Sequence, residues 1–84
     1  MPNVLIVDDD EDTRVLLQGG LQQRGFTVHT VGSGAECLEW ARAHDVDVVV
    51  TDIQMPGLTG VQLCEQLRAR HPHILSIVLT GVGT

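Results

Sequence analysis

The sequence contains no lysine and no tyrosine, and all of its basic residues are arginines. Its composition summary gives 5 basic against 11 acidic residues, and therefore a net charge of −6 at pH 7. Proteins that bind nucleic acid present a basic face to the phosphates. This charge balance argues against nucleic-acid binding by the segment itself.

Long apolar runs are absent as well. No stretch approaches the ~20 apolar residues needed to cross a bilayer, and the N-terminus lacks a signal-peptide pattern. A cytoplasmic protein without membrane contact is therefore expected. The 2 cysteines are too few for a disulfide scaffold, so Cys37 and Cys64 are expected to be reduced thiols in or near the core. The 84 residues are enough for one small domain with a marginal core.

What the sequence does contain is a regular alternation of two kinds of segment. Short runs rich in β-branched residues predict buried strands at Val4–Val7, Phe26–Val31, Val46–Thr51 and Ile74–Leu79. Segments with helical spacing lie between them, from the acidic run to Gly25, from Ser33 to His44, and from Thr59 to just before Pro72. Strands that alternate with helices favour right-handed crossovers and a parallel α/β sheet.

Polar side chains follow three of these strands. Asp8 and Asp9 come directly after the first strand, Asp52 after the third, and Thr80 after the fourth. In open parallel sheets, ligands bind at the carboxyl ends of the strands. If the first, third and fourth strands are neighbours, these four side chains converge on one crevice.

Three converging carboxylates repel one another unless a proton or a cation compensates them. Mg²⁺ suits such a site, since it binds a few carboxylates and keeps several waters. Neither Cys nor His stands at these strand ends, so a structural zinc site is excluded there. A metal ion beside a carboxylate and a hydroxyl can support phosphoryl transfer, because the metal neutralises charge on the transferred oxygens. The carboxylate itself can be the nucleophile. Gly32-Ser33-Gly34 lacks the lysine of a P-loop, so a bound nucleotide is not the expected donor.

Three motifs together resemble the receiver domain of two-component response regulators. They are "VLIVDDDEDTR" from residue 4, "DVVVTDIQMPGLTG" from residue 47, and "IVLTG" from residue 77, in the family's order. The resemblance covers the whole chain. It implies a flavodoxin-like (CheY-like) doubly wound parallel sheet with strand order 2-1-3-4. The family's fifth strand and last two helices have no counterpart in residues 1–84, which would be a partial receiver domain.

The resemblance also implies roles for the residues at the strand ends. Asp52 would be the phosphoacceptor, supplied by a histidine kinase or a phosphotransfer protein. Asp9 would bind Mg²⁺ directly, Asp8 would bind it through water, and the backbone carbonyl of Gln54 would be a further ligand. Thr80 would be the switch hydroxyl that moves toward the phosphoryl group, remodelling a surface read by an output domain or partner protein.

The sequence departs from the family pattern in two respects. Receivers carry a lysine at the end of the fifth strand, and this sequence has none. Without further strands, residues 74–79 would form an exposed apolar sheet edge, and the face of the first helix would be open. We therefore expect either a longer receiver or, if the chain is complete, dimerisation or domain swapping through that edge.

Three functions are compatible with the sequence. The first is a phosphorylation switch, which modifies only itself and is not an enzyme in the usual sense. The alternative is a pseudo-receiver or truncated binding module that keeps the fold without efficient phosphotransfer. A metal-dependent phosphotransferase is disfavoured, since such enzymes typically place a second acid two residues after the nucleophile, where this chain has Gln54.

Other residues near the motifs have simpler interpretations. The acids that follow the first two, Asp10, Glu11 and Asp12, are expected to face the positive end of the first helix. Arg14 is expected on the helix surface, with ion pairing to the acids as a minor alternative, and Trp40 in packing. The four histidines share no metal-ligand spacing on one face.

Glycine also interrupts the first helix. Gly19 and Gly20 each cost a helix interior about 1 kcal/mol relative to alanine. Close packing is the one reason for this pair that the sequence offers.

Overall fold

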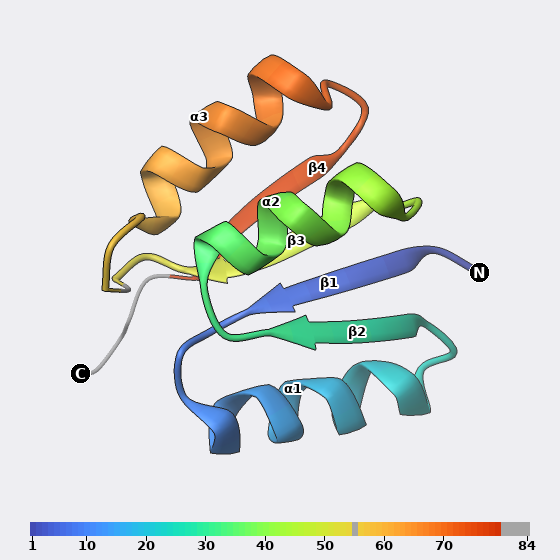
Figure 1. The fold of residues 1–84 in the computed structure, drawn as a ribbon. Coiled ribbons are helices and arrows are strands. Elements are labelled where there is room, and N and C mark those ends of the chain that lie inside the picture. The colour runs from blue at the N-terminus through green and yellow to red at the C-terminus, as the bar shows by residue number, and fades with distance from the viewer. Residues whose placement is uncertain (55, 80–84) are drawn as a thin grey trace.

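The computed structural model describes residues 1–54 and 56–79, and its elements follow the predicted alternation of strand and helix (Figure 1). In chain order they are β1 (Asn3–Val7), α1 (Glu11–Gln23), β2 (Thr27–Val31), α2 (Gly34–Ala43), β3 (Val48–Asp52), α3 (Gly60–Arg70) and β4 (Leu75–Leu79). The predicted boundaries differ from these by a few residues, as is usual for element ends.

The strands form one parallel sheet in the order β2-β1-β3-β4. This is the order expected from the receiver resemblance, and the flavodoxin-like α/β fold is confirmed for the described residues. All neighbouring strands pair in parallel, so their carboxyl ends lie at the same edge of the sheet, toward which the arrowheads of β1 and β2 point in Figure 1. The carboxyl ends of β1 and β3 therefore lie next to each other, as the argument for a shared crevice requires.

The helices cover the two faces unequally. Helices α2 and α3 lie together on one face, while α1 lies alone on the other, beside β2 and β1 (Figure 1). The buried core between the sheet and the helix pair consists of Leu5, Val7, Val31, Cys37, Ala41, Val46, Val49, Leu63, Leu67 and Ile74. Burial there raises the pKa of the Cys37 thiol to about 12, so this cysteine is held as an unreactive thiol.

Strand β1 is buried on both faces. Leu5 and Val7 belong to the core under α2 and α3, and alternation directs Val4 and Ile6 to the face that α1 covers. None of the four is more than 6% exposed. This burial explains why a continuous apolar run, rather than an alternating one, precedes the acidic residues.

Side-chain caps fix where each helix begins. Asp10, Ser33 and Thr59 are the N-caps, and each accepts a hydrogen bond from a backbone N–H in the first turn. Thr59 and Gln62 form a reciprocal capping box. Helix α1 ends before Gly25, whose φ of +94° is accessible to glycine at little steric cost. The helical segments predicted from Ser33 and from Thr59 thus begin at these two caps.

The face shared by α1 and the β4 side of the sheet is open. Leu75, Ile77 and Leu79 of β4 are 60%, 41% and 40% exposed, and Leu16 of α1 is 75% exposed. The expected apolar patch at the fourth strand is therefore present in the part of the chain that the structure describes. Dimerisation or swapping through it stays a prediction.

The glycine pair in α1 gives a different result from the one expected. A Cβ at Gly19 or Gly20 would have no atom within 4 Å outside the local helix backbone. Both residues are exposed. Close packing therefore does not explain them in this structure.

Candidate functional site

The register of the sheet brings two acidic strand ends side by side. Val7 of β1 pairs with Thr51 of β3, so the next residue on each strand, Asp8 and Asp52, extends the same row. One carboxylate oxygen from each of Asp8, Asp9 and Asp52 lies within 4.8 Å of the other two. The structure thus brings Asp52 into one cluster with Asp8 and Asp9, which are 43 or more positions away in the sequence.

Asp8 is the buried member of this cluster, with 7% of its surface exposed. Its backbone N–H donates to the carbonyl of Val31 over 3.2 Å, and its Oδ1 accepts the N–H of Asp10 over 2.9 Å. The pKa of Asp8 is raised, mainly by burial and further by the negative charges of Asp52, Asp9 and Asp10. The hydrogen bond from the Asp10 N–H lowers this pKa and offsets part of the rise. The three carboxylates are therefore held together against their mutual repulsion.

Asp52 is fixed from the opposite side by the start of α3. Directly after it, Ile53 donates its N–H to the carbonyl of Leu79 in β4 over 3.2 Å. The carbonyl of Ile53 in turn accepts the N–H of Gly60, the first residue of α3, over 3.1 Å. The end of β3 is thereby tied to both β4 and α3.

The donor set determines which ion the cluster suits. It consists of carboxylate oxygens only, and one of the three residues is buried while the other two are more accessible. Hard oxygen ligands of this kind fit Mg²⁺, which completes its octahedron with water. Gln54 follows closely and is exposed, whereas Thr80 lies outside the described residues.

The remaining acids of the run serve the helix, as expected. Asp10 caps α1 and accepts both the hydroxyl and the backbone N–H of Thr13. These bonds, first of all the one from the hydroxyl, hold the pKa of Asp10 below its usual value. Glu11 and Asp12 occupy the first turn of α1, where the helix dipole favours negative charge.

The sequence predicted Arg14 on the surface of α1, but in the structure its side chain also bonds to the backbone outside the helix. Its guanidinium reaches back toward β1 and donates from Nη1 to the carbonyl oxygen of Asp8 over 2.6 Å. Six residues separate the two, which is not a spacing that places side chains together on one helix. The contact joins α1 to the backbone at the end of β1, and the sequence pattern does not reveal it.

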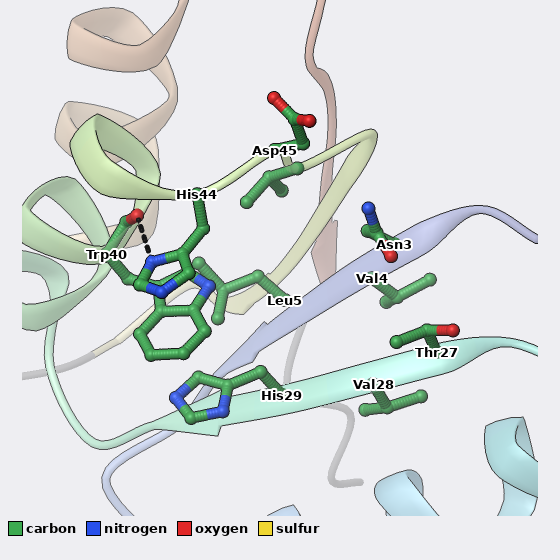
Figure 2. A pocket seen from close by; sticks show the side chains of 10 residues that line it. Asn3, Val4, Leu5, Thr27, Val28, His29, Trp40, His44 and Asp45 are labelled. Carbon is green, nitrogen blue, oxygen red and sulfur yellow. Dashed lines mark hydrogen bonds between the residues drawn. The ribbon is translucent and has the colours of Figure 1, made fainter.

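A separate groove lies at the other end of the sheet, near the amino ends of β1 and β2 (Figure 2). Its volume is about 350 Å³. The ring of Trp40 lies beside it, stacked against His29 and against His44 with ring centroids 3.5 Å apart in both pairs. His44 Nδ1 lies 3.1 Å from the carbonyl oxygen of Trp40 at the end of α2. The packing role expected for Trp40 is confirmed, but its histidine partners were not foreseen.

This stack predicts a pH dependence of stability. Partial burial, and secondarily the charge of His44, lower the pKa of His29. The folded state then binds the His29 proton less tightly than the unfolded chain, whose pKa is about 6.5. His29 therefore reduces stability as the pH falls through about 6.5 toward its lower folded-state pKa, and has no such effect well above pH 6.5.

The measurement is urea unfolding at pH 7.5 and 5.5. His29→Phe keeps an aromatic ring against Trp40 but cannot take up a proton, so its stability should fall less on acidification than that of the wild type. His73→Gln, at an exposed position outside the stack, should retain the wild-type difference. Equal losses for the wild type and His29→Phe would contradict the prediction.

Known proteins resemble this chain over nearly its full length. Residues 4–84 match the family model described as the response regulator receiver domain. The C4-dicarboxylate transport transcriptional regulatory protein DctD of Rhizobium meliloti is 38% identical over 82 residues, which make up 98% of this chain and 18% of that protein. The chain therefore spans less than a fifth of the length of this curated relative.

Solved structures give the same result for the fold. The response regulator protein TrrA of Thermotoga maritima, in complex with Mg²⁺-BeF, has a TM-score of 0.93 and 32% identity, covering 99% of this chain and 72% of its own. A complex of the histidine kinase ThkA with TrrA gives a TM-score of 0.91, also at 32% identity, covering 100% of this chain and 72% of the matched one.

Proposed function

This chain belongs to the response regulator receiver domain family, and we propose that it acts as a phosphorylation switch with Asp52 as its phosphoacceptor. The observation that carries the proposal is the cluster of Asp8, Asp9 and Asp52 within 4.8 Å at the carboxyl edge of the sheet. Asp52 is the member at the end of β3, between the other two acids and the start of α3. Receiver domains are signalling switches, so the chemistry is self-modification rather than turnover of a substrate.

The proposed step is a single transfer. A carboxylate oxygen of Asp52 attacks phosphorus, and an O–P bond forms as the P–N bond of a phosphohistidine donor breaks. The histidine leaves with the bonding electrons and takes a proton from water. With acetyl phosphate as the donor, the bond that breaks is P–O, and acetate leaves.

The other residues would prepare this step. Asp9 would bind Mg²⁺ directly and Asp8 through water, and the backbone carbonyl of Gln54 would supply a further oxygen. When bound, the ion neutralises charge on the phosphoryl oxygens. By holding the cation, Asp8 and Asp9 would reduce the repulsion between the Asp52 carboxylate and the incoming phosphoryl group. Thr80 is proposed as the hydroxyl that hydrogen-bonds the phosphoryl group and transmits the change.

The partner that supplies the phosphoryl group is proposed to be a histidine kinase or a phosphotransfer protein. The ThkA–TrrA complex supports this choice, because its response regulator shares the fold of this chain at 32% identity. The relative DctD is named as a transcriptional regulatory protein, which supports an output domain or partner protein that reads the switch. No helix in the described residues is long and apolar enough to span a membrane. We propose a cytoplasmic location.

A pseudo-receiver is the alternative to this switch. Such a chain would keep the fold and the acidic cluster, and would bind partners without efficient phosphotransfer.

Intact-mass analysis after incubation with acetyl phosphate and Mg²⁺ separates the two candidates. The wild type should gain one phosphoryl group, and Asp52→Asn should gain none, because the amide is not a comparable nucleophile. Asp12→Asn, an exposed acid in the first turn of α1, is the matched control and should label like the wild type. Labelling that survives Asp52→Asn would contradict the assignment. An unlabelled wild type that still binds Mg²⁺ would favour the pseudo-receiver.

A further inference from the structure

The backbone at the acidic cluster is held by an arginine from outside the cluster. Arg14 lies in α1, and its Nη1 donates to the carbonyl oxygen of Asp8 over 2.6 Å in a partly buried setting. The same guanidinium lies close to the loop between β2 and α2. A Cβ built on Gly32 would lie 3.2 Å from Arg14 Nη1 and 3.4 Å from a carboxylate oxygen of Glu36.

This hydrogen bond completes the anchoring of Asp8. Its N–H donates to Val31, its side-chain Oδ1 accepts from Asp10, and its carbonyl accepts from Arg14. A bond from a charged donor is stronger than one between neutral groups. The carbonyl belongs to the peptide that joins Asp8 to Asp9, so the bond fixes the plane of that peptide and the direction in which the exposed Asp9 side chain leaves the backbone.

We infer that Arg14 is a positioning residue of the cluster, which holds the Asp8–Asp9 peptide so that both carboxylates face Asp52. The inference rests on the proposed function, because it assigns Arg14 a role in presenting the Mg²⁺ ligands. Arg14 need not touch the ion or the phosphoryl group.

Charge and positioning predict opposite effects of removing this arginine. A cation near a Mg²⁺ site repels the ion, so by charge alone Arg14→Gln would bind Mg²⁺ more tightly. If Arg14 positions the ligands, the same variant binds Mg²⁺ more weakly. Outer groups that orient metal ligands typically contribute 10–100-fold in metal affinity, and we expect about tenfold here, at the low end, because Arg14 acts through the backbone.

Calorimetric titration with Mg²⁺ measures this affinity without any phosphotransfer. Arg14→Gln should bind about tenfold more weakly than the wild type. Arg14→Lys, which keeps a charged donor, should recover most of the affinity. Arg24→Gln, at the exposed C-cap of α1, is the matched control and should stay within about twofold of the wild type. Binding by Arg14→Gln that equals or exceeds that of the wild type would overturn the inference.

A second variant reaches the same bond from the loop, in case Arg14→Gln does not fold. Gly32→Ala places a methyl group against the Arg14 guanidinium and should displace it, weakening Mg²⁺ binding by about two- to threefold, a smaller effect than outright loss of an orienting group. The inference would also be overturned if Gly32→Ala bound Mg²⁺ with unchanged affinity and Arg14→Lys did not recover the wild-type affinity. A wild type that binds no Mg²⁺ would overturn it as well. A wild type that binds Mg²⁺ normally but is not labelled by acetyl phosphate would refute the proposed function alone.

Discussion

Asp8→Asn is expected to be more stable than the wild type without Mg²⁺, and less stable than the wild type when Mg²⁺ is saturating. Without the ion, the substitution removes a buried charge that faces the carboxylates of Asp52 and Asp9. The Asn carbonyl can still accept the N–H of Asp10, so that hydrogen bond is kept. We expect the free energy of unfolding to rise by about 1–2 kcal/mol, a discounted share of the repulsion between charges at this separation.

In saturating Mg²⁺ the wild type becomes the more stable of the two proteins. A ligand that binds only the folded state stabilises it by RT ln(1 + [L]/Kd), about 2.7 kcal/mol at a hundredfold excess over Kd. The wild type gains this amount, and the variant gains little, because it has lost one of three clustered carboxylates. The two stability curves therefore cross as Mg²⁺ is raised.

Urea unfolding in EDTA and in excess Mg²⁺ tests the crossing. Asp12→Asn is the matched control: it removes an exposed acid from the first turn of α1 and should lower stability slightly in both conditions, without a crossing. A loss of stability for Asp8→Asn in EDTA would show that the Asp8 carboxylate is stabilised by its surroundings rather than repelled by the other acids.

Local sequence signals predicted the elements of this protein well, for reasons visible in the structure. The continuous apolar run of β1 reflects burial on both faces, and the caps Ser33 and Thr59 make the hydrogen bonds that their side chains allow. The proximity of Asp8 and Asp52 could not be predicted from these local signals alone. It depends on β1 and β3 being neighbours, an order that the resemblance supplied and that periodicity alone does not contain.

Contacts between distant segments escaped prediction. Stacking of His29 on Trp40 requires a particular rotation of α2 over β2, and helical spacing does not specify which strand residue a helix will meet. The sequence predicted Arg14 as a surface residue of the helix. Its hydrogen bond to the Asp8 carbonyl depends on the conformation of the acidic loop, which the sequence pattern does not specify. The exposed Leu16 likewise fits the helical pattern without being buried by any described element.

Gly60→Ala is expected to destabilise the chain by about 3 kcal/mol, because a Cβ at this position would collide with backbone that cannot move aside. The nearest atom to that Cβ is the carbonyl oxygen of Asp52, followed by Ile53 Cα at 3.0 Å and the Asp52 carbonyl carbon at 3.1 Å. Helix α3 must then withdraw from the end of β3, although its Leu63 and Leu67 are fully buried in the core.

Gly20→Ala is the matched control for this substitution and should have the opposite sign. A Cβ there meets nothing within 4 Å outside the local helix backbone, so replacing glycine inside α1 should raise stability by about 1 kcal/mol. Both variants are compared with the wild type by urea unfolding. An unchanged midpoint for Gly60→Ala would mean that α3 does not start as close to Asp52 as the structure has it.

The same variant also tests whether α3 positions the phosphoacceptor. The colliding atom belongs to Asp52 itself, so a retreat of α3 should move the end of β3 relative to Asp8 and Asp9. In the folded fraction of Gly60→Ala, Mg²⁺ affinity should then fall, whereas in Gly20→Ala it should not. If the folded fraction binds Mg²⁺ like the wild type, the contact between Gly60 and Asp52 supports the fold without setting the geometry of the acidic cluster.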